Sequence, residues 1–205
     1  MCRTVRSDLE ASPPVARGNR SELSDLDRMT SRIILPLLAA CLLAACSPAG
    51  PVGNGAVPQP AKSVDVERYL GRWFELGRYE NGFERGCEAV TAEYSLRQDG
   101  LVKVVNTCNA GGVDGKERVA VGRAKVVPGS GNAKLRVSFF GPFLGDYWIL
   151  DHAPDYAWSI VGEPSGRYLW ILTRSPTPSE PVRKKLESRA RSLGYDVTML
   201  RWTRH

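Results

Sequence analysis

The sequence has few of the residues on which catalytic and metal sites usually depend. Only two of its 205 residues are histidines, His152 and His205, and neither stands in a Ser-His-Asp array or at metal-ligand spacing. The net charge of +6 is spread along the chain, without a stripe of Lys and Arg interleaved with aromatic residues. Because nucleic-acid-binding domains concentrate positive charge in such stripes, we expect no nucleic-acid site. We also expect no catalytic residue, metal ion or cofactor.

A membrane-spanning run is missing as well. The apolar run from Ile33 to Ala45 is shorter than the ~20 residues of a transmembrane helix. A short basic segment, Met29-Thr30-Ser31-Arg32, precedes it, and this order is typical of an export signal. Residues 1–28 carry ten charges of mixed sign and do not resemble the start of a signal. We therefore expect Met29 rather than Met1 to be the start, residues 1–28 to be an over-extended N-terminus, and residues 29–45 to be a lipoprotein signal peptide.

Cysteine directly ends the apolar run. Leu43-Ala44-Ala45-Cys46 resembles a bacterial lipobox, in which the cysteine is acylated and becomes the mature N-terminus. Cys41 fits the same pattern with a shorter run, and a plain cleaved signal is the other alternative. Acyl chains on Cys46 would hold the protein to a membrane, since each buried CH₂ contributes ~0.8 kcal/mol. Ser47 in the next position favours the outer membrane. Residues 46–63 are rich in Pro, Gly and Ala, which predicts a flexible tether.

The rest of the chain, residues 64–205, is predicted to form one all-β domain. Short alternating segments separated by Gly- and Pro-containing turns indicate a sandwich or an up-and-down barrel. The expected strands are Arg72–Tyr79, Cys87–Leu96, Leu101–Cys108, Glu117–Val127, Ala133–Phe140, Tyr147–Asp151, Tyr156–Gly162 and Arg167–Arg174. A short helical turn over Val64–Leu70 precedes them, and a last strand, Asp196–Trp202, ends the chain.

One helix is expected after the eight strands. Thr177-Pro178-Ser179-Glu180 has an N-cap residue, a proline at the first helical position and a glutamate three residues after the cap. The apolar positions that follow fall on one helical face, and Gly194 ends the helix. The helix should therefore pack its apolar face on the outside of the sheet. Those positions are Val182, Leu186, Ala190 and Leu193.

Two cysteines lie nearly opposite each other in the second and third strands. Asp99-Gly100 between alternating segments is a strong hairpin signal, and this hairpin brings Cys87 close to Cys108. An exported protein can keep a disulfide, and adjacent strands bring the two sulfur atoms within reach. We predict a Cys87–Cys108 bond, with two free buried thiols as the alternative.

The first strand begins with a Gly-x-Trp. Gly71 allows a backbone turn, and Trp73 points to the same side two residues later. Arg174 ends the eighth strand, and a guanidinium stacked on an indole contributes roughly 0.5–2 kcal/mol. We expect Arg174 to cover Trp73 and close one end of a barrel. The alternative is an ordinary core tryptophan and a surface arginine.

Five stretches together resemble the lipocalin family, in its branch of bacterial outer-membrane lipoproteins similar to apolipoprotein D. Asp155-Tyr156 stands where the family has a second motif, but Pro154 replaces the familiar threonine before it. The resemblance implies an eight-stranded antiparallel up-and-down barrel with a cup for small apolar ligands, which in the bacterial branch are fatty acids or lysophospholipids. The five stretches are residues 69–75, 83–86, 92–96, 137–143 and 168–176.

The resemblance and strand alternation together suggest which residues line the cup. Because Arg174 points inward, Leu172, Trp170 and Tyr168 should share its face. The remaining residues come from the comparison with apolipoprotein D, to which we add Trp158; the alternative is a packed core without a cavity. The candidate ligand-binding residues are Tyr94, Asn106, Phe139, Tyr147, Trp158, Tyr168 and Trp170.

These expectations combine into one functional hypothesis. The protein would carry or store fatty acids or lysophospholipids at the bacterial outer membrane, with its domain facing the periplasm. A lipid-modifying enzyme and a structural envelope lipoprotein without ligand are the alternatives. The sequence leaves open whether the protein forms a homodimer.

Overall fold

The computed structural model describes residues 51–205. The expectations for residues 1–28, the signal peptide and acylated Cys46 lie outside the described residues. Within the described part, none of the helices combines the length and apolar character needed to cross a membrane.

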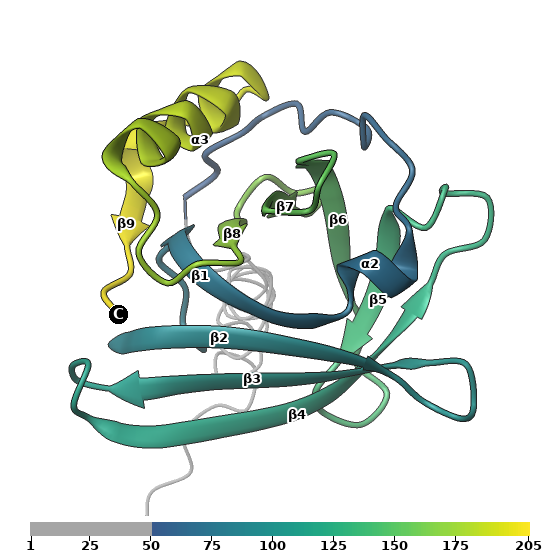
Figure 1. Cartoon of the computed structure of the whole chain (residues 1–205). Helices are drawn as coiled ribbons and strands as arrows, with labels where there is room; N and C mark the ends of the chain where they lie inside the picture. Colours follow the sequence, from purple (N-terminus) through teal and green to yellow (C-terminus); the bar gives the residue numbers. More distant parts are fainter. Residues whose placement is uncertain (1–50) are drawn as a thin grey trace, which may run out of the picture. The chain divides into compact units, whose positions relative to one another are not determined.

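Eight antiparallel strands form a closed barrel (Figure 1). Each strand pairs with the next, and β1 pairs with both β2 and β8, which closes the ring. The predicted fold class is therefore confirmed. The strands are β1 (Gly71–Tyr79), β2 (Cys87–Leu96), β3 (Val102–Ala110), β4 (Lys116–Val126), β5 (Lys134–Ser138), β6 (Gly145–His152), β7 (Trp158–Gly162) and β8 (Leu169–Thr173).

The strand connections lie alternately at the two ends of the barrel. The short helix α2 (Val66–Tyr69) precedes β1 at one end, which we call the base. The β2–β3, β4–β5 and β6–β7 turns share the base, because consecutive strands are antiparallel. The β1–β2, β3–β4, β5–β6 and β7–β8 connections lie at the other end, which we call the mouth.

The C-terminal helix packs outside the barrel, as predicted. Helix α3 (Glu180–Ser192) starts later than the sequence suggested, with Ser179 as its N-cap residue. The proline in the first turn is Pro181 rather than Pro178. A proline at the helix start was therefore predicted correctly, but three residues too early. Gly194 follows the helix with a φ of +91°, a conformation that glycine adopts without strain.

The end of the chain differs from the single strand that was expected. Its first part is a 3₁₀ turn, η2 (Val197–Met199), and only β9 (Leu200–Trp202) is extended. Strand β9 pairs with the second half of β1, where β1 no longer pairs with β2.

Apolar side chains form two clusters on the two faces of the barrel wall. The inner cluster fills the barrel around Trp73 and Tyr94. The outer cluster lies between the wall and α3, where Leu186 and Ala190 of the helix are fully buried. This arrangement explains why β7 and β8 are apolar on both faces.

Residues 53–63 are held against the barrel rather than forming part of a flexible tether. The backbone N–H groups of Gly53 and Asn54 donate to Gly166 O in the β7–β8 turn, at 3.0 and 3.2 Å. Further along, Ala61 N donates to Leu150 O at 3.1 Å. The segment thus runs from the mouth end, across β6, toward α2 at the base (Figure 1).

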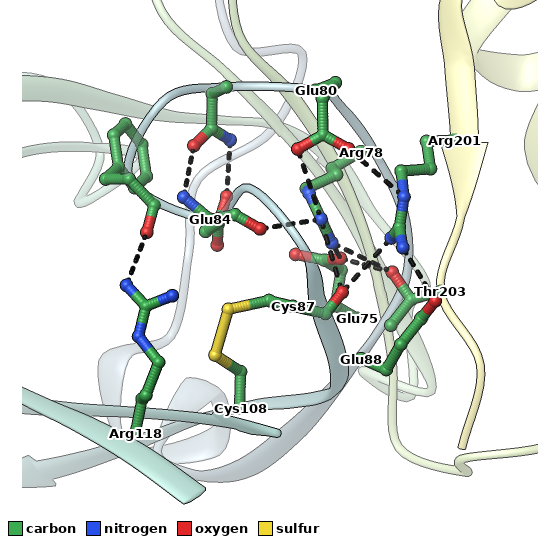
Figure 2. Close-up of a disulfide and its surroundings, with 12 residues drawn as sticks. Glu75, Arg78, Glu80, Glu84, Cys87, Glu88, Cys108, Arg118, Arg201 and Thr203 are labelled. Carbon is green, nitrogen blue, oxygen red and sulfur yellow. Dashed lines mark hydrogen bonds and ion pairs between the residues drawn. A yellow bond between two sulfur atoms is a disulfide. The ribbon is translucent and has the colours of Figure 1, made fainter. Parts of the chain in front are cut away.

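The predicted disulfide is confirmed. The sulfur atoms of Cys87 and Cys108 are 2.07 Å apart, and both residues are buried. The bond joins β2 to β3 close to the mouth, beside a cluster of charged side chains (Figure 2).

Candidate ligand-binding cup

The base is closed by Trp73 and Arg174. Trp73 is fully buried, and its indole Nε1 donates to Tyr69 O at 2.8 Å. The guanidinium carbon of Arg174 lies 3.8 Å from the centre of the Trp73 ring. The same guanidinium donates to Arg72 O at 2.7 Å and to Leu70 O at 2.9 Å. Arg174 therefore ties the segment around α2 to the end of β8.

Gly71 is required at this closure by its backbone conformation. Its φ is +87°, which side chains other than glycine rarely adopt. A Cβ here would lie 3.5 Å from a guanidinium nitrogen of Arg174, which is ordinary contact. Strain, rather than lack of space, therefore favours glycine at this position.

Above the closure, four hydroxyl groups form a chain inside the barrel. The hydroxyl oxygens of Tyr94 and Tyr147 are 2.9 Å apart, and those of Tyr147 and Tyr69 are 3.2 Å apart. Tyr69 also lies 3.1 Å from the Ser159 hydroxyl. Burial raises the pKa of Tyr69 to about 12 and raises the pKa values of Tyr94 and Tyr147 as well. All three phenols therefore stay protonated. The four hydroxyl groups have four hydrogen atoms but share only three hydrogen bonds, so one hydroxyl hydrogen is left to donate to another acceptor.

Asn106 places an unpaired polar atom on the inner face. It alternates with the buried interior residue Val104 along β3, and it pairs with Ala92, which packs against the inner cluster. The Oδ1 atom of Asn106 is buried and has no hydrogen-bond partner among residues 51–205. A buried acceptor without a donor costs about 1–3 kcal/mol. The amide is thus positioned to accept a hydrogen bond from a guest molecule.

The cavity at the base is small. Its volume is about 20 Å³, which is room for about one water molecule. Farther from the base, Phe139 and Trp170 pack against the inner cluster and stay half-buried. A hydrocarbon chain would therefore have to displace side chains in order to enter deeply. The base cavity is lined by Val64, Val66, Tyr69, Leu70, Tyr94, Val102, Asn132, Leu135, Tyr147 and Ile149.

The β1–β2 connection covers part of the mouth. The rings of Tyr168 and Trp170 stack with centroids 5.6 Å apart, and Phe83 stacks on Tyr168 at 5.8 Å. Trp170 Nε1 donates to a carboxylate oxygen of Glu84 at 3.0 Å. From β4, Arg118 donates to Phe83 O at 3.5 Å (Figure 2). Sequence reasoning missed Phe83 and Glu84 as cup residues, although residues 83–86 were among the stretches that carried the family resemblance.

The expectation for Trp158 needs correction. Its neighbour Ser159 points inward, because the Ser159 hydroxyl contacts Tyr69. Trp158 therefore faces outward, where it packs against the outer cluster beneath α3. It does not line the cup. The other candidates that lie on the inner face or at the mouth are Tyr94, Asn106, Phe139, Tyr147, Tyr168 and Trp170.

A buried ion pair lies between the cup and the end of the chain (Figure 2). The Arg78 guanidinium donates to a Glu75 carboxylate oxygen at 2.6 Å, and both side chains are buried. Thr203 donates to the same oxygen of Glu75. Burial, together with the charge of Glu84, raises the pKa of Glu75 to about 7, although Arg78 acts in the opposite direction. Among the described residues, no group of His, Cys, Asp and Glu is arranged to hold a metal ion.

Comparison with known families and proteins agrees with this geometry. The family model of a lipocalin-like domain matches residues 64–205. The outer membrane lipoprotein Blc of Escherichia coli (strain K12) is 40% identical over 174 residues, covering 82% of this chain and 96% of that protein. The protein of the same name from Vibrio cholerae is 35% identical, with the same two coverages.

Solved structures show the same fold at lower identity. Insecticyanin from the tobacco hornworm Manduca sexta matches with a TM-score of 0.59 and 19% identity, over 74% of this chain and 87% of the other. Lobster apocrustacyanin A1 matches with a TM-score of 0.56 and 20% identity, over 76% and 93% of the two chains. At these identities the match concerns the fold alone.

Proposed function

This chain belongs to the family of lipocalin-like domains, and from that premise we propose that its barrel binds one fatty acid or lysophospholipid at the bacterial outer membrane. Relatives named as outer membrane lipoproteins support this location, since the match covers 96% of their length. Cys46, which directly ends the apolar run, would carry the acyl anchor. The domain would then face the periplasm.

The observation that carries the proposal is a polar atom left unpaired on an apolar inner wall. Asn106 Oδ1 is a buried acceptor without a donor, and the surrounding inner cluster is apolar and aromatic. A ligand with a long hydrocarbon chain and a hydroxyl group satisfies both conditions. Lysophospholipids carry such a hydroxyl on their glycerol, as fatty acids do in their protonated form.

Entry of an acyl chain requires the half-buried aromatic side chains to rearrange. The cavity of about 20 Å³ at the base does not admit a chain. Phe139 and Trp170 are half-buried, and their movement would open the part of the barrel nearer the mouth. Burial of each methylene then contributes ~0.8 kcal/mol, which drives binding without a catalytic step.

Lipid analysis of the full chain tests this proposal. The mature protein is purified from its membrane, and bound lipid is extracted and identified by mass spectrometry. We expect about one acyl lipid per protein chain beyond the covalent anchor, and uptake of added lysophosphatidylethanolamine with a change in tryptophan fluorescence. If the purified protein carries no lipid and takes up none, the proposed binding is refuted.

The small cavity makes a structural envelope lipoprotein the second candidate. A protein of this kind would keep its packed interior at every lipid concentration. Fluorescence of the half-buried Trp170 would then stay constant during lipid titration, whereas a ligand that enters the cup displaces this side chain. Sedimentation of the purified chain tests whether it forms a homodimer.

A further inference from the structure

Large apolar side chains are exposed around the mouth. In the β5–β6 connection, Phe140, Phe143 and Leu144 are 76%, 77% and 52% exposed. Phe83 in the β1–β2 connection is 56% exposed. Up-and-down topology places both connections at the same end of the barrel. Large exposed apolar side chains favour contact with an apolar partner, and we call these four residues the apolar rim.

The N-terminal segment approaches the barrel at this same end. Its backbone joins Gly166 in the β7–β8 turn through Gly53, and the Tyr79 hydroxyl at the end of β1 donates to Gly53 O at 3.4 Å. From Gly53 onward the chain is held by the barrel, so only the residues between Cys46 and Gly53 can act as a spacer. This spacer of six residues, 47–52, allows at most about 25 Å between Cys46 and Gly53 when it is fully extended.

The short spacer limits which end of the barrel can face a membrane. Strand β1 has 9 residues, so the wall is about 30 Å long at 3.3 Å per residue, before its tilt is taken into account. An anchor near Gly53 could place the base on the membrane only if the spacer ran fully extended along the wall. With the mouth toward the membrane, the spacer can stay relaxed.

We propose that the apolar rim docks on the surface of the lipid bilayer, so that the mouth faces the membrane and ligands pass directly between bilayer and cup. The inference rests on the proposed anchoring of the chain through Cys46. It commits to a bilayer as the partner because the spacer keeps Gly53, which is bound at the mouth end, within about 25 Å of the anchor.

The charges around the rim indicate what kind of contact this is. Four exposed cations lie around the rim, and two of them, Arg118 and Arg123, donate to backbone oxygens of Phe83 and Gly141 in the two connections. The other two are Arg85 and Lys116, and the exposed acidic residues are Asp114 and Glu117. Because positive charges outnumber negative ones, the rim should dock more strongly on anionic than on neutral bilayers, and added salt should weaken docking.

Spin labels at the two ends of the barrel test the orientation. The mature, acylated protein is reconstituted in phosphatidylethanolamine–phosphatidylglycerol vesicles as Phe143→Cys or Glu67→Cys. Glu67 is the control, since it is exposed and lies in α2 at the base. A mature protein that starts at Cys46 lacks Cys2 and Cys41. With Cys87 and Cys108 bonded and Cys46 acylated, the introduced thiol is then the one available for a nitroxide.

Accessibility of each nitroxide to oxygen and to a water-soluble nickel chelate then measures its depth. We expect the oxygen-to-nickel ratio to be at least threefold higher at position 143 than at position 67. Equal ratios, or a higher ratio at position 67, would overturn the proposal. Dipolar broadening between labels at position 143 would also overturn it, since a second copy would then cover the rim.

A second variant distinguishes the effect of rim docking from the effects of the anchor and of ligand affinity. Phe140→Ser/Phe143→Ser should take up lysophospholipid from vesicles several-fold more slowly, with unchanged affinity for lipid presented below its critical micelle concentration. Mass spectrometry of the N-terminal peptide tests acylation of Cys46 by itself. If Cys46 is acylated but the label at position 143 lies no deeper in the bilayer than the label at the base, docking alone is refuted. If Cys46 is unmodified, both the anchor and the docking inference are refuted.

Discussion

Lys62 Nζ lies 2.7 Å from one carboxylate oxygen of Asp151, and this contact fastens the N-terminal segment to the barrel. The other oxygen of Asp151 accepts a hydrogen bond from Arg189 of α3, also at 2.7 Å. The side chain of Asp151 is almost fully buried, whereas both cations are partly exposed. One carboxylate on β6 thus joins three parts of the chain.

Replacing this carboxylate should loosen both attachments. Burial by itself would raise the pKa of Asp151, but hydrogen bonds from Lys62 and Arg189 lower it below its ordinary value. A lowered pKa in the folded state means that the contribution to stability is present above the unfolded-state pKa of about 3.9 and is lost as the pH falls through the folded-state value. For Asp151→Asn we expect a loss of about 1–3 kcal/mol at pH 7, together with a weaker decline in stability at acid pH. Urea unfolding from pH 2 to 7 measures both effects.

A surface carboxylate provides the control for this prediction. Asp146 pairs with Arg136 at 2.9 Å, but both side chains are substantially exposed. Asp146→Asn should therefore cost less than about 1 kcal/mol. Equal losses for the two variants would contradict the role assigned to Asp151.

The stack of Arg174 on Trp73 should be specific for a guanidinium. Lysine keeps the charge but cannot donate to several backbone carbonyls in a fixed plane. Arg174→Lys and Arg174→Ala should therefore both lower the free energy of unfolding, by about 1 and 3 kcal/mol. Chemical denaturation measures this loss, with Arg72→Ala as a control because Arg72 forms an exposed ion pair. A lysine variant as stable as the parent would refute the proposed role of the planar group.

Glu75 should give the protein an unusual dependence on pH. Its pKa is raised to about 7 in the folded state, above the value of about 4.3 in an unfolded chain. The folded state therefore holds a proton that the unfolded state releases, and the contribution to stability is full below about pH 4.3 and is lost as the pH rises toward 7. In Glu75→Gln this decline should disappear. The difference in unfolding free energy between parent and variant, measured from pH 4 to 8, should change with pH; a constant difference would contradict the raised pKa.

Asn106 should affect stability and binding in opposite directions. Asn106→Leu removes a buried acceptor that has no partner, so the ligand-free protein should be as stable as the parent or more stable by about 1 kcal/mol. Binding of lysophosphatidylethanolamine should weaken by about tenfold, which corresponds to ~1.4 kcal/mol. Thermal unfolding and fluorescence titration measure the two effects. Unchanged affinity would exclude Asn106 from the ligand site.

Much of the barrel could be predicted from local patterns. Alternation and turn residues gave the strands, and the Asp99-Gly100 turn aligned Cys87 with Cys108 closely enough to predict their bond. These features depend on neighbours in the same hairpin. They can therefore be derived without knowing the rest of the fold.

Contacts between distant parts of the chain were harder to predict. Residues 53–63 have the composition of a linker, and their docking depends on acceptors in Gly166 and Leu150, about ninety or more residues away. Trp158 was placed on the wrong face because α3 covers the outside of β7, which makes both faces of that strand apolar. Alternation carries no information where both faces are buried.

The seam between β1 and β2 is filled by the last residues of the chain. Arg204 N and Arg201 contact Glu88 of β2, Ala89 N donates to Arg204 O, and Thr203 reaches Glu75 of β1. These contacts hold the part of the wall beyond Phe74, where β1 and β2 no longer pair. Deleting residues 201–205 would therefore leave Glu75, Glu88 and the N–H of Ala89 without these partners, and water could enter the barrel through its side.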